Sequence, residues 1–296
     1  MRLLAVSDLH LGHEANRLAL AGVSDHHDDW LIVAGDVGET FAHLELAWRT
    51  LTPRFAKIFW TPGNHELWTT PESPARPDAP GAPRGAARYD ALVDLCRAFG
   101  IVTPEDPFET WPGDGRTVIA PIFTLYDYSF RPDDVAEDEA VAWARASGVL
   151  CSDERLLSPE PFASRGAWCR ERVRITGARL DALPADRPTV LASHFPLRYD
   201  LARPPRIPRF SIWCGTRLTE DWGARYRASV LVSGHLHLRS TLTRDGIRCE
   251  EVSLGYPREW NRDRSFDSFL REILPLARPD PDYLANRWRG DPFIMQ

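Results

Sequence analysis

The chain has 296 residues, 43% of them hydrophobic, which is enough for one sizeable core. A formal net charge of −6 lacks the basic excess of a protein that binds nucleic-acid phosphates, so we expect no stable nucleic-acid binding. The five cysteines have no Cys-x-x-Cys spacing and indicate neither a disulfide framework nor a cysteine zinc site. The opening "MRLLAVSD" lacks the pattern of a signal peptide, and no later segment has the length of a membrane span. These features predict a cytoplasmic protein that does not bind membranes.

The first third of the chain alternates short hydrophobic runs with helical or loop segments, which is typical of an α/β sheet. Hydrophobic runs at 2–8, 30–36 and 56–66 each end in polar residues. α/β proteins build their sites on loops that follow the carboxyl ends of strands, so these runs are predicted to carry function. Between the second and third run, residues 41–51 have the spacing of an amphipathic helix.

Residues 70–88 are dominated by proline, glycine and alanine, and we expect them to form a mobile surface loop. No linker or repeat interrupts the rest, so a single domain is predicted over 1–296, with an irregular tail from about residue 263. The other predicted elements are helices at 88–100 and 166–183, a mobile or helical acidic segment at 131–148, strands at 116–125, 188–194 and 228–235, and a hairpin at 238–254 that turns at Asp245-Gly246.

Five blocks of polar residues follow the predicted strands. In "VSGHLHLRS", His235 and His237 are two residues apart, so in a strand their side chains would share a face. A single polar residue after a strand is usually a turn or cap residue, but five blocks in order favour one shared site. Oxygen and imidazole ligands without thiolate suit iron, manganese or zinc. The blocks are SDLH with Asp8 and His10, AGD with Asp36, GNHE with Asn64 and His65, ASHFP with His194, and GHLH with His235 and His237.

This series of blocks resembles the calcineurin-like metallophosphoesterases. The resemblance implies a four-layer α/β/β/α sandwich, with two mixed sheets face to face, helices outside, and a dinuclear metal site at the strand-end loops. It also implies hydrolysis of a phosphoester with two divalent ions, of which manganese and iron are the expected metals and zinc a further candidate. Carried over block by block, it implies a first metal held by Asp8, His10 and His237, a second held by Asn64, His194 and His235, and Asp36 bridging both.

Catalytic roles follow from the same resemblance. His65 adjoins a metal ligand without being one in the family pattern, so it is the expected general acid for the leaving alkoxide. Glu39 stands where relatives carry an acidic residue that orients this histidine, although a charge at a helix N-terminus explains it about equally well. Thr40 stands where protein phosphatases of this superfamily carry a phosphate-clamping arginine, which counts against a protein phosphatase.

Longer similarities narrow the expected substrate. They resemble the bacterial phosphopantetheinyl hydrolases, which remove the 4′-phosphopantetheine arm from holo-acyl carrier proteins. The resemblance covers the chain to about residue 262 and departs in the proline-rich loop, at Thr40 and in the tail. It implies an acidic carrier protein as substrate. The segments that carry it are FAKIFWTPGNHELWTT, ARYDALVDLC, GIVTPEDPF, LYDYSF, LLSPEPF, AWCRERV, FSIWCGT and EEVSLGYPREW.

Substrate contacts are expected from arginines and one aromatic residue. Arg198, Arg206 and Arg209 follow His194 closely, and an arginine cluster beside the metals would suit an acidic partner or a phosphate. A solvated loop stiffened by proline explains the same arginines about equally well. Tyr126 is a candidate wall for the apolar arm, although aromatic residues more often belong to the core.

Alternative functions remain open at this point. The same two-metal chemistry serves small-molecule and nucleotide phosphatases and phosphodiesterases. A DNA nuclease fits the acidic composition less well. A non-catalytic scaffold would usually have lost ligands, whereas every block is intact in this sequence.

Overall fold

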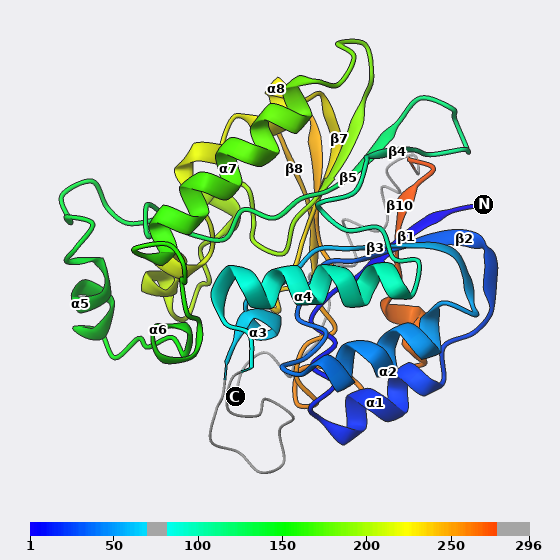
Figure 1. The fold of residues 1–296 in the computed structure, drawn as a ribbon, viewed down its shortest axis with the longest axis horizontal. Coiled ribbons are helices and arrows are strands. Elements are labelled where there is room, and N and C mark those ends of the chain that lie inside the picture. The colour runs from blue at the N-terminus through cyan, green and yellow to red at the C-terminus, as the bar shows by residue number, and fades with distance from the viewer. Residues whose placement is uncertain (70–81, 277–296) are drawn as a thin grey trace.

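The computed structural model describes residues 1–69 and 82–276, which form two β-sheets with helices on their outer faces (Figure 1). The first sheet has the strand order β10-β1-β2-β3. β1, β2 and β3 are parallel, and β10 pairs with β1 antiparallel. Their bounds are β1 Leu3–Val6, β2 His26–Val33, β3 Phe55–Trp60 and β10 Arg271–Leu274.

The second sheet has the order β4-β5-β6-β7-β9-β8. β5, β6, β7 and β9 are mutually parallel, whereas β4 and β8 add antiparallel pairings at the two edges. Both sheets are therefore mixed, as expected. The bounds are β4 Glu109–Thr110, β5 Val118–Pro121, β6 Thr189–Ala192, β7 Ala228–Ser233, β8 Ser240–Arg244 and β9 Ile247–Glu251.

Alternation along each strand builds the layers. In β1, Leu3 and Ala5 belong to a hydrophobic cluster shared by both sheets, whereas Leu4 packs on the helical side. In the second sheet, Val190 faces the first sheet and Leu191 packs against the outer helices. Strands buried on both faces read as continuous apolar runs, which is why the sequence shows these strands without polar alternation.

The helices cover the outer faces. Figure 1 shows α1, α2 and α4 together beside the first sheet, and α7 and α8 beside the second. α2 spans the predicted residues, and Thr40 caps it by accepting a hydrogen bond from the His43 N–H at 3.2 Å. The helices are α1 Glu14–Ala21, α2 Phe41–Leu51, α3 Asn64–Leu67, α4 Gly85–Ala98, α5 Ala140–Arg145, α6 Asp153–Leu156, α7 Arg165–Asp181 and α8 Trp222–Arg225, and the 3₁₀ helices are η1 Tyr199–Leu201, η2 Pro208–Trp213, η3 Arg217–Thr219 and η4 Phe266–Phe269.

Two boundaries differ from the expectations. The expected loop at 70–88 overlaps α4, which already begins at Gly85, where a positive φ of 54° lets the chain turn into the helix. The tail expected to be irregular contains η4 and β10, because pairing with the edge of β1 orders a four-residue strand that is too short to show a period. The first part of the predicted proline-rich loop, 70–81, and the chain from 277 lie outside the described residues.

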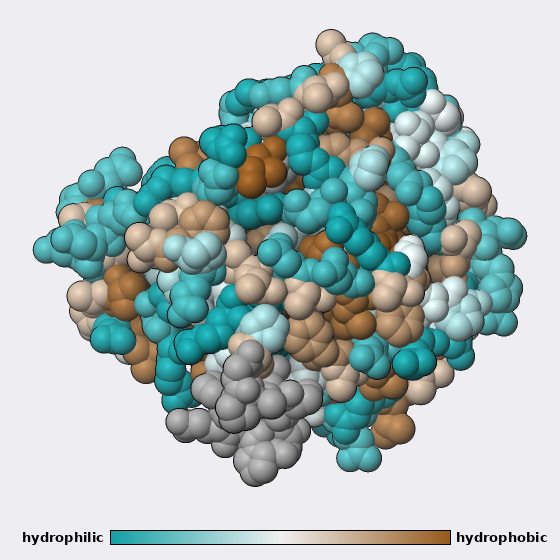
Figure 2. Space-filling view, in the orientation of Figure 1, coloured by the Kyte–Doolittle hydropathy of each residue, from teal (hydrophilic) through white to brown (hydrophobic). Residues whose placement is uncertain are grey.

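The face seen in Figure 1 is mainly hydrophilic. Figure 2 shows hydrophilic residues over most of it, with hydrophobic residues scattered among them. Among the described residues, no helix combines the length and apolar character needed to cross a bilayer.

Candidate dinuclear metal site

The expected ligands meet where the parallel strands of both sheets end. Ser7 and Ser253 form a parallel bridge between the two sheets just beyond β1 and β9, which draws the strand-end loops together. Asp8 and His10 follow β1, Asp36 follows β2, Asn64 and His65 follow β3, His194 follows β6, and His235 and His237 follow β7.

Three of these residues form a first group. Nε2 of His237 lies 3.1 Å from Oδ1 of Asp8 and 3.0 Å from Nε2 of His10. Asp8 and His10 are buried, while the His237 side chain keeps 14% of its surface exposed. The first group therefore closes around a point near the surface.

A second group lies deeper. Nε2 of His194 lies 3.4 Å from Oδ2 of Asp36, and Nδ1 of His235 lies 3.2 Å from Oδ1 of Asn64. All four residues are buried. Asp36 forms a compact cluster with His194 and His235, and another with His10 and His65, so its carboxylate lies between the two groups.

The donor atoms fit metal ions. Ligands bound at about 2.1 Å to one ion lie roughly 3.0–3.4 Å apart, which matches the spacings within both groups. Within the described part of the chain, Nε2 of His194, one of these spaced donor atoms, is also buried without a hydrogen-bond partner. A buried polar atom without a partner costs free energy unless something binds it. The spacing of the donor atoms and the unpaired nitrogen of His194 both indicate divalent cations, although they do not select one metal.

The ligand loops have an unusual backbone. Asp8, His10, Asp36, His235 and His237 all have φ between 42° and 74°, the left-handed region that non-glycine residues rarely adopt. Such conformations concentrate at functional sites, where the surrounding structure holds them in place.

Two glycines let the backbone approach the carboxylates. A Cβ at Gly63 would lie 2.0 Å from Oδ1 of Asp36, and a Cβ at Gly234 would lie 2.3 Å from Oδ2 of Asp8. Neither position can accommodate a side chain without moving a carboxylate, which explains the glycines in "PGNHE" and "SGHLH".

The charges of the candidate site are arranged in pairs. Burial raises the pKa of Asp8 and of Asp36, but nearby histidines outweigh it and hold both pKa values below their usual range. Burial lowers the pKa of His194 and His237, but Asp36 and Asp8 outweigh it and raise them to about 10 and about 11. Bound cations would replace these two protons as partners of the carboxylates.

Burial favours the neutral form of the other two candidate histidine ligands, His10 and His235. Burial, together with the neighbouring His65, lowers the pKa of His10 to about 3. Burial, together with His194, lowers the pKa of His235 to about 3. Neutral imidazoles already carry the lone pair that a metal needs.

Glu66 ties two of the ligand loops together. Its carboxylate accepts hydrogen bonds from the backbone N–H groups of Asp36, Val37 and Gly63 at 2.9–3.0 Å. Burial, reinforced by Asp36, raises the pKa of Glu66 to about 8. The buried Arg88 donates to the carbonyls of Glu66 and Glu39, and so joins the loop after β2 to α3.

The expected general acid has two supports. Nδ1 of His65 lies 3.3 Å from Oε1 of Glu39, the acidic residue expected to orient it. Its ring also contacts Trp68, with 3.7 Å between the ring centroids. Burial lowers the pKa of His65, but Asp36 and Glu39 outweigh it and raise that pKa above its usual value.

Three residues that have no role in the sequence interpretation contact the candidate ligands from outside. This outer layer consists of Asp153, Glu259 and Ser253. Asp153, fully buried, accepts hydrogen bonds from Nδ2 of Asn64 at 2.9 Å and from Nε1 of Trp68 at 2.6 Å. Glu259 lies 2.7 Å from Nδ1 of His237, and the hydroxyl of Ser253 donates to Asp8 at 2.7 Å. Glu259 stands inside "EEVSLGYPREW", one of the segments that carry the longer resemblance, but Asp153 has no such signal.

The ligands open into a cavity of about 210 Å³. Asp36, Asn64, His65, His235 and His237 line it on one side. Its remaining wall comes from Pro204, Ile207, Phe210, Leu236, Tyr256 and Glu259. A substrate can therefore reach the bridging carboxylate and His65 from the same space.

The expected substrate-contact residues lie in different surroundings. Tyr126 is fully buried and donates to Oδ2 of Asp153 at 2.9 Å, so it offers no surface to a ligand in this structure. Arg198 pairs with Asp200 and Asp245.

The two other arginines also differ from one another. Arg209 donates to the carbonyl of Trp143 and lies over its ring. Arg206 is exposed, one residue from Ile207 in the cavity wall. The structure therefore does not gather the three expected arginines into one cluster.

Known proteins are similar to this chain in sequence and fold. The chain is 48% identical over 285 residues to the acyl-carrier-protein phosphodiesterase PptH of Mycobacterium tuberculosis, which covers 95% of this chain and 86% of that protein. The crystal structure of the phosphopantetheinyl hydrolase from M. tuberculosis superposes with a TM-score of 0.85 at 48% identity, covering 95% of this chain and 97% of that one. The family model of the calcineurin-like phosphoesterases matches residues 1–239, and this chain belongs to that family.

Proposed function

We propose that this protein hydrolyses the phosphodiester that joins 4′-phosphopantetheine to a serine of a carrier protein, giving the apo-protein and free 4′-phosphopantetheine. The observation that carries the proposal is the 48% identity to an acyl-carrier-protein phosphodiesterase across 95% of the chain. Identity at this level extends well beyond the metal-binding blocks. It favours a carrier-protein substrate over the nucleotides that related two-metal sites also accept.

In this proposal, Asp8, His10 and His237 would hold a first divalent cation, and Asn64, His194 and His235 would hold a second. Asp36 lies between the groups and would bridge both ions. Manganese and iron suit these oxygen and imidazole donors, and zinc is a further candidate. When bound, the two ions activate water and neutralise the oxygens that attack and leave in an in-line displacement.

Side chains of the protein would protonate the leaving group. As the bond from phosphorus to the serine oxygen breaks, that oxygen needs a proton. His65 lines the cavity and is held between Glu39 and Trp68, which suits it to deliver this proton. Glu39 would then be a positioning residue that acts through His65.

An acidic carrier protein would meet an exposed cation at the cavity rim. Arg206 is exposed beside the cavity wall and is the contact we propose. Arg198 forms an ion pair and Arg209 a hydrogen bond within the chain. Their contribution would therefore be to shape the loop after His194. We also propose a cytoplasmic location, because all five cysteines are free thiols, as in a reducing compartment.

The intact mass of a purified holo-acyl carrier protein, before and after incubation with the enzyme and Mn²⁺ or Fe²⁺, tests the proposal. The expected result is loss of the whole phosphopantetheine mass, leaving unmodified serine. His65→Ala should slow this loss, whereas His27→Ala, at an exposed histidine far from the ligands, serves as the matched control. An unchanged mass together with rapid hydrolysis of nucleotides would overturn the carrier-protein assignment.

A further inference from the structure

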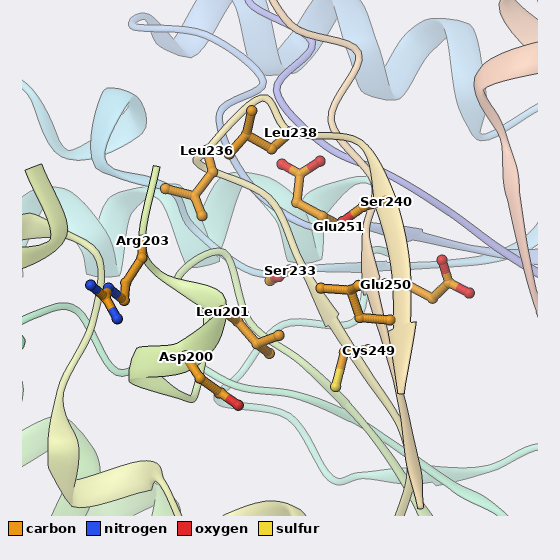
Figure 3. A pocket seen from close by; sticks show the side chains of 11 residues that line it. Asp200, Leu201, Arg203, Ser233, Leu236, Leu238, Ser240, Cys249, Glu250 and Glu251 are labelled. Atoms are coloured by element: carbon orange, nitrogen blue, oxygen red, sulfur yellow. The ribbon is translucent and has the colours of Figure 1, made fainter. Parts of the chain in front are cut away.

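A second cavity, of about 160 Å³, lies beside the metal site (Figure 3). It lies between two small hydrophobic clusters, one containing Cys249 with Leu201 and Leu242 packed against it, the other with Leu236 at its edge. In Figure 3, Leu201 and Cys249 lie in the lower half of the view, and Leu236 lies above them. The proposed reaction assigns no role to this cavity.

The two cavities share a wall. Leu236 lines both of them and stands between His235 and His237 in the chain. On the facing loop, Arg203 lines the second cavity and its neighbour Pro204 lines the first. A chain-like ligand fixed at the metal site could therefore pass along Leu236 into the second cavity.

The distance from the candidate metal site to the far end of the second cavity suits an extended ligand of defined length. Cys249 pairs with Leu231 in the β7–β9 register, and Leu231 precedes His235 by four residues. At about 3.3 Å per residue, the far end of the cavity lies roughly 13 Å from that ligand position. A phosphopantetheine arm has the length of about five extended residues, or roughly 16 Å from phosphate to thiol. The arm is long enough to start at the metals and end near Cys249.

The polar groups of the second cavity favour an uncharged ligand. Ser233, Ser240 and the carboxylate of Glu251 line it and can accept hydrogen bonds. The Arg203 guanidinium points away from the centre and lies over the Tyr199 ring at 5.7 Å. A ligand with N–H and O–H donors is satisfied here, whereas a second phosphate would face the carboxylate of Glu251 while Arg203, the arginine of the lining, points away.

We propose that the second cavity binds the pantetheine arm of the substrate, with its amide and hydroxyl groups along Ser233, Ser240 and Glu251 and its thiol end toward Cys249. The inference rests on the proposed function and deepens it by assigning the arm to one side of the metal site. The serine of the carrier protein then leaves on the side of His65. The cavity becomes the element that selects a neutral, amide-bearing chain over a nucleotide carrying further phosphates.

Filling the cavity from its rim tests the inference. Leu201 is half-buried on η1, so Leu201→Trp should occupy the cavity while the strands keep their packing. We expect the ratio of kcat/KM for holo-carrier protein to kcat/KM for bis(p-nitrophenyl) phosphate, a diester without an arm, to fall about tenfold or more. Leu18→Trp, at a leucine on α1 that is 68% exposed, is the matched control and should leave the ratio unchanged. Leu242→Phe provides a second variant from β8 if Leu201→Trp does not fold.

Competition separates failure of this inference from failure of the proposed function. Pantetheine, which has no phosphate, should inhibit wild-type hydrolysis of bis(p-nitrophenyl) phosphate and should inhibit a folded cavity variant at least tenfold less strongly. Equal inhibition of both, or an unchanged substrate ratio in both folded variants, would overturn the cavity assignment. A wild-type enzyme that leaves holo-carrier protein intact would overturn the proposed function instead, and pantetheine inhibition would still report on the cavity.

Discussion

The two halves of the candidate metal site are built differently. In the first half, Glu259 and Ser253 support His237 and Asp8, and both His237 and Glu259 keep exposed surface, 14% and 30%. In the second half, the ligand His194 lies 2.9 Å from the carbonyl of Ala34 and is wholly buried.

The ring of His235 in the second half packs among aromatic side chains, with Phe195 and Phe210 within 5.7 Å between centroids. The comparison teaches that one half reaches solvent through a candidate ligand and its charged partner, whereas the other half is enclosed by backbone, packed rings and the buried Asp153. We therefore expect the halves to differ in how easily they lose a metal, and the predictions below test that difference.

The largest effect is expected where the halves meet. Asp36→Asn removes one charge from the carboxylate shared by both groups, so both ions should bind more weakly. Outer-layer changes at metal sites cost about 10- to 100-fold, so loss of this shared ligand should lower hydrolysis more than 100-fold. Metal content by mass spectrometry and steady-state rates measure this. Asp94→Asn on the exposed side of α4 is the control, and a variant that keeps two metals and full activity would refute the shared role.

The next effect concerns only the second half. Asp153→Ala frees the amide of Asn64 and the indole of Trp68, which should weaken metal binding in the buried half by about 10- to 100-fold. Titration of the metal-depleted protein with Mn²⁺, followed by calorimetry, would resolve one weakened site beside one unchanged site. Tyr126→Phe removes only the third hydrogen bond to Asp153 and should have a smaller effect. Equal weakening of both sites would contradict the division into halves.

A milder change is expected in the first half. Glu259→Gln keeps an acceptor beside Nδ1 of His237 but removes its charge, which should weaken the near-surface metal about tenfold, at the low end for outer-layer partners. The same calorimetric titration detects this. Glu137→Gln, at an exposed glutamate paired with Arg170, is the matched control. The prediction is wrong if Glu259→Gln and Asp153→Ala weaken metal binding at the same site.

The smallest effect is expected in the unmodified protein. A chelator should remove the metal of the exposed half several times faster than that of the buried half, because solvent reaches His237 and does not reach His194. Stopped-flow absorbance with a coloured chelator would show two phases, and Glu259→Gln should accelerate only the faster one. A single phase for both metals would show that the halves release together.

Sequence reasoning could bring the candidate ligands together because each follows a hydrophobic strand, and parallel strands place their carboxyl ends together. Tyr126 illustrates a limit, since an aromatic residue near a site looks the same in sequence whether it lines a cavity or supports a ligand from behind. Asp153 shows another, because 89 residues separate it from Asn64 and only the tertiary fold brings them together. The contacts of the arginines after His194 could not be predicted for a similar reason. Their long side chains can pair with residues far away in the sequence, as Arg198 does with Asp245.

The left-handed backbone of five candidate ligands would link the metal supply of a cell to the lifetime of this protein. Each such residue stores about 1 kcal/mol or more, and together they are a sizeable share of the 5–15 kcal/mol that keeps a typical domain folded. Any cation that binds only the folded chain offsets this stored strain. Chains made during metal starvation would open more often and meet proteases more often, so the cell would hold less of the enzyme as well as a less active one.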